Sequence, residues 1–152
     1  MTGASTLLHL SAPDGAELPH ALLERAVRLA LVREGVGEGE MSITFLGDEA
    51  IRELNRDYLD HDWIPDVLSF ALHDEGEAPH GDIYVGFEQA RRQARREGVS
   101  QEEELVRLVL HGLLHVLGHD HPEAPEERKD SRLYRLQEEL VQAVFAAPEE
   151  DS

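Results

Sequence analysis

Apolar and polar positions alternate along this chain with two different periods. Short segments rich in β-branched and aromatic residues predict four strands, at residues 5–10, 41–46, 66–72 and 82–87. Segments with apolar residues every three or four positions predict five helices, at 19–35, 48–59 and 88–98, from Gln101, and from Pro125. We therefore expect one α+β domain spanning residues 1–152, in which a small mixed sheet of about four strands packs with about five helices. Its acidic tail, 147–152, should fray.

The helix that starts near Gln101 differs from the others because it is apolar on nearly every face. Ser100 followed by Glu103 forms a capping box at its start. The sequence ELVRLVLHGLLHVLG follows, and this composition predicts a buried helix. Gly118 is placed to end it, because glycine adopts the left-handed conformation of a helix C-terminus without steric cost.

Composition narrows the chemistry that the chain can carry. It has no cysteine, so a metal ion would have to be held by His, Asp or Glu. Its net charge of −18 favours solubility and argues against a general affinity for nucleic acid. There is no apolar run of about 18 residues and no signal-peptide pattern, so we expect a soluble cytoplasmic protein that does not enter a membrane.

One predicted helix is a local exception to the acidic balance. It carries four cationic side chains on neighbouring turns: Arg91, Arg92, Arg95 and Arg96. This cationic stripe could hold phosphate groups. An equally good interpretation is a solvated helix face whose charge is balanced by nearby glutamates.

The segment HGLLHVLGHDH, residues 111–121, contains four of the nine histidines. His111 and His115 are one helical turn apart, so both imidazoles project from the same face and can share one ion. On a buried apolar helix each imidazole would otherwise need its own hydrogen-bond partner, and a metal satisfies both. The pattern therefore favours a metal site over two unrelated core histidines.

A third ligand can come from beyond the helix end. Gly118 lets the chain turn back, so that either His119 or His121 can reach the ion, and we favour His121 because the turn needs several residues. Three imidazoles with an open fourth position are typical of catalytic zinc, one ion per chain. Asp120 is a candidate to orient one of the ligands through its other ring nitrogen.

The spacing of these histidines is also that of the metzincin proteases, H-E-x-x-H-x-x-G-x-x-H. In that motif a glutamate after the first histidine acts as the general base. Here Gly112 occupies that position, and it has no side chain that could take a proton. The zincin-like metal helix is thus predicted without the peptidase base.

Three ordered motifs resemble the YbeY family of bacterial endoribonucleases. Residues 54–70, LNRDYLDHDWIPDVLSF, are similar to the family's LNxxYRxxDxxTDVLSF, residues 81–94 to its GDI-V segment, and residues 111–121 to its HGxLHLxGxDH signature. The resemblance implies that His111, His115 and His121 are the metal ligands. It also implies zinc-dependent cleavage of single-stranded RNA in 16S rRNA 3′-end maturation and ribosome quality control, with the small ribosomal subunit as partner.

The chain departs from the family pattern at two positions. Leu59 stands where the family has an arginine after the tyrosine, and Pro65 stands where it has a threonine. The catalytic arginine therefore cannot be carried over. Arg56 is a weak substitute on nearly the same helix face, and a solvated surface arginine is at least as good an interpretation. His61 and Asp62, in the adjacent loop, could also reach the site.

Two other functions fit the same residues. The metal could serve a hydrolase of another substrate, such as a peptide. Alternatively, a structural zinc could support a ribosome-assembly factor that binds without cutting, and Leu59 makes this alternative less remote. The residues do not decide whether water or the ribose 2′-hydroxyl attacks the phosphate.

Overall fold

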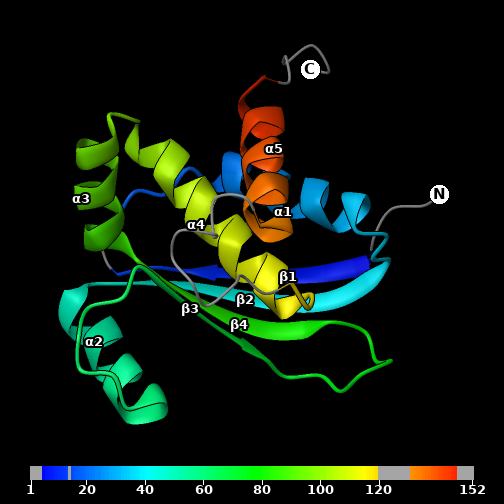
Figure 1. Ribbon diagram of the computed structural model, residues 1–152, viewed down its shortest axis with the longest axis horizontal. Helices are drawn as coiled ribbons and strands as arrows, with labels where there is room; N and C mark the ends of the chain where they lie inside the picture. Colours follow the sequence, from blue (N-terminus) through cyan, green and yellow to red (C-terminus); the bar gives the residue numbers. More distant parts are fainter. Residues whose placement is uncertain (1–4, 14, 120–130, 147–152) are drawn as a thin grey trace.

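The strands form one open mixed sheet. A computed structural model describes residues 5–13, 15–119 and 131–146. The strand order is β1 (Ser5–Ser11), β2 (Glu38–Leu46), β4 (His80–Gly86) and β3 (Val67–Ala71). β1 and β4 both run parallel to β2, whereas β3 is an antiparallel edge strand beside β4. The mixed four-stranded sheet is thus confirmed (Figure 1).

Five helices are described: α1 (His20–Arg33), α2 (Asp48–Leu59), α3 (Phe87–Glu97), α4 (Gln101–Val116) and α5 (Arg132–Ala146). Four of them lie on one side of the sheet, and α2 lies on the other side (Figure 1). The prediction of an α+β fold is therefore confirmed. None of the described helices is long and apolar enough to cross a membrane.

The apolar circumference of α4 is explained by its central position. α4 packs against α1, α3 and α5 and against strands β3 and β4. Gly112 allows the close approach to the sheet: a Cβ atom added there would lie 2.7 Å from Cγ2 of Ile83 and 3.2 Å from Cγ2 of Val67. The glycine thus brings the helix that carries the histidine motif directly against β3 and β4.

Hydrogen bonds define both ends of α4. At the start, the Ser100 hydroxyl accepts from the backbone N–H of Glu103 at 3.0 Å, as the capping box predicts. At the end, Gly118 has φ 107°, and its N–H donates to the carbonyl of His115, while that of His119 donates to Leu114. This pair of bonds is a Schellman motif, so the helix ends at the predicted glycine.

Several element boundaries differ from the expected ones. β2 begins at Glu38, three residues before the predicted start at 41, because its polar first residues pair with β1. The predicted helix start at Pro125 lies outside the described residues, as does the acidic tail 147–152. α5 is described from Arg132, where the Ser131 hydroxyl accepts from the backbone N–H of Tyr134 at 3.1 Å.

Candidate metal centre and pocket

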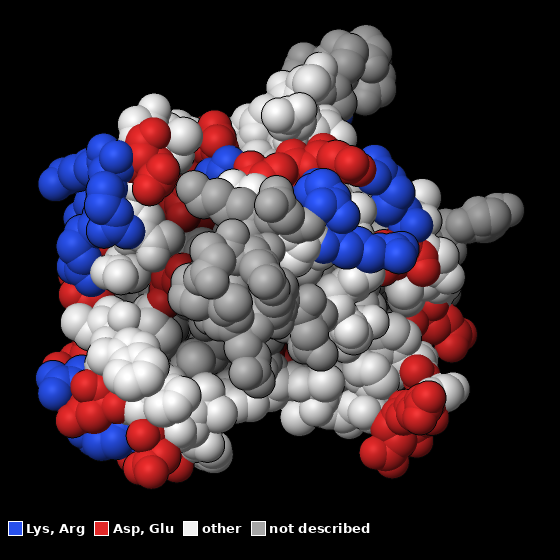
Figure 2. Space-filling model, viewed as in Figure 1, with Lys and Arg blue, Asp and Glu red and all other residues white. Residues whose placement is uncertain are grey.

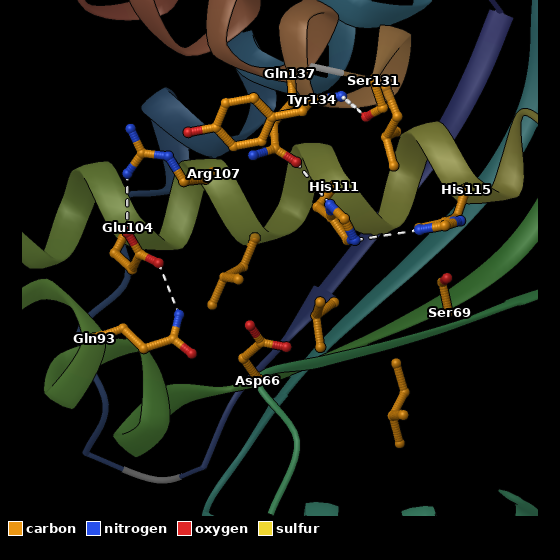
Figure 3. A pocket seen from close by; sticks show the side chains of 14 residues that line it. Asp66, Ser69, Gln93, Glu104, Arg107, His111, His115, Ser131, Tyr134 and Gln137 are labelled. Atoms are coloured by element: carbon orange, nitrogen blue, oxygen red, sulfur yellow. Dashed lines mark hydrogen bonds and ion pairs between the residues drawn. The ribbon is translucent and has the colours of Figure 1, made fainter. Parts of the chain in front are cut away.

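The two helical histidines of the motif lie together, as their spacing predicts. Both project from the same face of α4, and their Nε2 atoms are 3.2 Å apart. The ring centroids of His111 and His115 are 4.7 Å apart, with an angle of 70° between the ring planes. Both residues are half-buried, so the two nitrogens face each other at the edge of the core (Figure 3).

This separation fits two ligands of one metal ion. Two nitrogens that each bind a tetrahedral zinc at about 2.0–2.1 Å lie about 3.3–3.4 Å apart. The observed Nε2–Nε2 distance of 3.2 Å is close to that value. Within residues 5–13, 15–119 and 131–146 no group of three or more His, Asp or Glu side chains could hold a metal, so His111 and His115 are a pair of candidate ligands in the described part and not a complete site.

His119 is engaged elsewhere. Its Nε2 atom lies 2.6 Å from a carboxylate oxygen of Glu34, the residue that follows α1. This contact links the end of α4 to α1 and occupies one of the two ring nitrogens of His119. His121 and Asp120 lie outside the described residues, so His121 as third ligand and Asp120 as its neighbour stay predictions.

His111 has a partner on α5 that the sequence pattern did not single out. Its Nδ1 atom lies 2.7 Å from Oε1 of Gln137, a residue only 4% exposed (Figure 3). Gln137 occupies an inward position of α5, one turn after the buried Leu133. The only feature of the sequence that could have pointed to Gln137 is its place as a polar residue on an otherwise apolar helix face. A buried amide there requires a polar partner.

A pocket of about 670 Å³ opens beside the two histidines. It lies between α4, α5 and β3 (Figure 3). Polar and charged residues make up much of its lining: Asp66, Ser69, Gln93, Glu104, Arg107, His111, His115, Ser131, Tyr134 and Gln137. A pocket of this size and polarity can admit a segment of a polar substrate next to the ligand atoms.

Asp66 is the carboxylate available in this pocket. It directly precedes β3, and its backbone carbonyl accepts from the N–H of Gly86 at 2.8 Å, which fixes its place beside the sheet. Its side chain points into the pocket (Figure 3). Among the described residues this carboxylate has no hydrogen bond or ion pair, so it can accept a proton or bind a substrate hydroxyl.

The far end of the pocket is a network of paired charges. Arg107 contacts carboxylates of three residues, Glu103, Glu104 and Glu138, at 2.8–2.9 Å. Glu104 is 4% exposed and also accepts from Nε2 of Gln93 at 2.8 Å. Hydrogen bonds, first of all to Glu138, raise the pKa of Arg107 despite its partial burial. The guanidinium therefore stays charged.

The family of the protein follows from its similarity to known proteins. Residues 13–144 match the family model described as endoribonuclease YbeY. This span covers most of the chain. The chain belongs to the YbeY family. The resemblance of the three motifs is thereby confirmed. Membership of this family makes the protein a nuclease, which is a type of hydrolase.

Individual relatives agree with this assignment. A protein of Halalkalibacterium halodurans named endoribonuclease YbeY is 41% identical over 134 residues, covering 80% of this chain and 81% of its own. Its namesake from Aquifex aeolicus is 42% identical over 112 residues, covering 72% and 75%. The solution structure of TM1509 from Thermotoga maritima, 27% identical, superposes with a TM-score of 0.63 over 96% of this chain and 97% of that one.

The segment that departs from the YbeY pattern does not line the pocket. Nε of Arg56, the weak catalytic candidate, lies 3.5 Å from a carboxylate oxygen of the adjacent Asp57. Leu59 is 42% exposed, and the His61 ring stacks on the Trp63 ring with centroids 4.4 Å apart. None of these residues belongs to the pocket lining, so the structure brings no arginine from α2 to the histidines.

The loop after α2 is held by polar contacts that the sequence did not reveal. Asn55 is 1% exposed and donates from Nδ2 to the backbone carbonyl of Trp63 at 3.1 Å. Asp62 accepts from Arg52 at 2.9 Å, and this hydrogen bond lowers the pKa of the Asp62 carboxyl. These contacts fix the chain that leads into Asp66 and β3.

The cationic stripe on α3 is partly used within the protein. It forms a cluster of blue side chains over α3 in Figure 2. Arg92 donates to Asp48 at 2.7 Å, which joins α3 to α2, and Arg91 lies over the Phe87 ring. Asp48 is the first residue of α2, and Gly47 takes the N-cap position before it.

Proposed function

We propose that this protein is a zinc-dependent endoribonuclease that cuts single-stranded RNA in the cytoplasm, in 16S rRNA 3′-end maturation and ribosome quality control. One zinc ion per chain would be held by His111, His115 and His121. The observation that carries the proposal is the 3.2 Å separation of the two histidine Nε2 atoms beside a polar pocket of about 670 Å³. Membership of the YbeY endoribonuclease family supports RNA as the substrate.

The donor set fits zinc, because neutral imidazoles are among its preferred ligands. Zinc bound there would supply Lewis acidity next to the phosphate, where negative charge develops during cleavage. His111 and His115 would hold the ion, and Gln137 contacts the far side of the His111 ring. Small ribosomal subunits, which carry the 16S rRNA, are the proposed partner.

Asp66 is the group in the pocket best placed to move a proton. Because the first histidine is followed by Gly112 and not by glutamate, the base must come from another element. Asp66 lies just before β3, and its side chain points into the pocket that His111 and His115 also line (Figure 3). We assign to Asp66 the role of general base, which accepts the proton of the attacking group. That group is either water or the ribose 2′-hydroxyl.

The packing around Gly112 disfavours a peptidase of the metzincin type. A Cβ atom at this position would already lie 2.7 Å from Ile83. A glutamate there would have to displace the sheet before its carboxylate could act. The motif spacing is therefore retained while the protease base is sterically excluded.

The test is cleavage of an end-labelled single-stranded RNA by the purified protein. His115→Ala, prepared in parallel, controls for contaminating nuclease, and Asp74→Asn, a change in the exposed β3–β4 loop, is the control for Asp66→Asn. We expect the wild-type protein and Asp74→Asn to cut, chelation to abolish cleavage, and zinc to restore it. His115→Ala and Asp66→Asn should not cut, but Asp66→Asn should still bind zinc.

The alternatives predict different results. If the wild-type protein carries zinc but leaves RNA intact, the metal serves another substrate or the fold. If His115→Ala still binds ribosomal particles as tightly as the wild-type protein while RNA stays intact with both, the assembly-factor function is correct. End-group analysis identifies the nucleophile, since only attack by the 2′-hydroxyl leaves a 2′,3′-cyclic phosphate or its hydrolysis product.

A further inference from the structure

The side of the His111 ring that faces away from His115 is held by a chain of polar contacts. Nδ1 of His111 lies 2.7 Å from Oε1 of Gln137, and Nε2 of Gln137 donates to the Glu138 carboxylate at 3.0 Å. Glu138 in turn accepts from Nε and Nη2 of Arg107 at 2.8 and 3.0 Å. The chain thus runs from Arg107 to His111, one turn apart on α4, through two consecutive residues of α5.

The Glu138 carboxylate determines the direction of the Gln137 amide. Burial acts to raise the pKa of Glu138, but hydrogen bonds from Arg107 and Gln137, together with the charge of Arg107, leave that pKa below its ordinary value. The carboxylate is therefore ionised at neutral pH and can only accept hydrogen bonds. The amide NH₂ of Gln137 must face Glu138, which leaves the amide oxygen to face His111.

An amide oxygen is only an acceptor, and this fixes the proton on the imidazole. The short contact to Gln137 requires that Nδ1 of His111 carries a hydrogen. In the neutral ring the lone pair then lies on Nε2, the atom that faces His115. The direction of a glutamine side chain on α5 thus determines which nitrogen of His111 can bind a metal.

We propose that Gln137 is a positioning residue that holds His111 in the Nδ1–H tautomer, and that the Arg107–Glu138 ion pair holds the Gln137 amide in the required direction. The metal-binding part of this inference rests on the proposed function; the tautomer does not. Gln137 is 4% exposed, so without it a buried Nδ1–H would lose its acceptor. The YbeY resemblance did not point to this residue.

The experiment measures the tautomer in metal-free protein by ¹⁵N NMR of the histidine side chains, at a pH at which the rings are neutral. In the wild-type protein we expect a protonated-type shift for Nδ1 of His111 and an unprotonated-type shift for Nε2. Gln137→Leu should move both shifts toward the other tautomer. Gln142→Leu, at an exposed position of the same helix, should leave both unchanged.

Zinc affinity, measured by competition with a chelator, is the second readout. Gln137→Leu should bind zinc about 10–100-fold more weakly, the usual effect of removing a group that orients a ligand histidine. Gln142→Leu should bind it as the wild-type protein does. A Gln137→Leu protein with weaker zinc binding but an unchanged tautomer would overturn the proposal, because the residue would then act only through packing.

Gln137→Glu covers the case in which the leucine variant fails to fold. It keeps an acceptor for His111, so we expect the Nδ1–H tautomer to remain. A change of tautomer in this variant, or an Nε2–H tautomer in the wild-type protein, would overturn the proposal. If the expected tautomer is found and the wild-type protein binds no zinc, the proposed function fails and the positioning role stands.

Discussion

His111, within α4, and His119, just beyond its end, each contact a side-chain oxygen, but they use opposite ring nitrogens. His111 contacts Gln137 through Nδ1, and its Nε2 faces His115. His119 contacts Glu34 through Nε2. The contact of His111 leaves its Nε2 facing His115, as the proposed metal site requires, whereas the contact of His119 joins the end of α4 to α1.

The two contacts also differ in their support. Gln137 is 4% exposed, and its contact with His111 continues into the charge network of Arg107. The contact between His119 and Glu34 joins side chains that are each 18% exposed. A supported and buried contact restricts the orientation of a ring more tightly, which is what a catalytic ligand requires. The predictions below test this difference.

The largest expected effect is on RNA cleavage. His111→Ala and His115→Ala each remove a proposed metal ligand. We expect each to reduce the cleavage rate by more than about a hundredfold, which exceeds the usual effect of losing a group that only orients a ligand. His119→Ala should cleave within about twofold of the wild-type rate, because its effect is confined to helix packing. Rates on one labelled single-stranded RNA give the comparison, and a His119→Ala rate as low as that of His111→Ala would contradict it.

The next effect is on stability, through Arg107. Arg107→Leu leaves three carboxylates without their shared cation, and we expect the free energy of unfolding to fall by about 3 kcal/mol, as for other partly buried ion pairs that lose one partner. Urea denaturation at neutral pH measures this change. A loss below about 0.5 kcal/mol would show that the network behaves like exposed surface pairs.

The same network predicts a pH dependence. The pKa of Glu138 is lowered in the folded protein, so its contribution to stability is complete above the ordinary glutamate pKa and is lost as the pH falls through the lower, folded value. Arg107 stays charged throughout. Urea denaturation from pH 7 to pH 3 should show less acid destabilisation in Arg107→Leu than in the wild-type protein, and parallel curves would refute the coupling.

A smaller loss is expected at Gly112. A methyl group there meets the side chains of Ile83 and Val67, so Gly112→Ala should destabilise the protein by about 1–3 kcal/mol, the usual cost of overpacking. Thermal unfolding measures it. Gly118→Ala would also strain the protein, through a φ of 107°, but has nothing within 4 Å of the added atom, so it separates backbone strain from packing.

The smallest effect is expected for the His119 contact. Glu34→Gln keeps an acceptor and removes the charge, so we expect a change in the free energy of unfolding of about 0.5–1.5 kcal/mol. Zinc affinity should be unchanged. A tenfold loss of zinc affinity in this variant would place His119 among the ligands.

Much of this arrangement could be predicted from the sequence, because it depends on local rules. The period of apolar residues located the strands and helices, and the one-turn spacing of His111 and His115 placed both imidazoles on one face. The end of the helix at Gly118 could be predicted because the left-handed conformation of a glycine depends on local structure. The boundaries of β2 depended on pairing with another strand, so its pattern alone placed the start too late.

The contacts between distant segments could not be predicted in this way. Gln137 and Glu138 come from a helix 26 residues away from His111 in sequence, and no local pattern indicates which polar residue of α5 meets which residue of α4. The same holds for Asp66, which reaches the pocket only because β3 forms the sheet edge beside α4. Glu34 and His119 are 85 residues apart, and only the fold brings them together.

Zinc binding by single-histidine variants shows whether His111, His115 and His121 together hold one metal ion. Metal-free wild-type protein and the variants His111→Ala, His115→Ala, His119→Ala and His121→Ala would each be titrated with zinc against a competing chelator. We expect about one tightly bound zinc per chain for the wild-type protein and for His119→Ala, and none for the other three variants. Tight binding that survives His111→Ala, or is lost in His119→Ala, would contradict it.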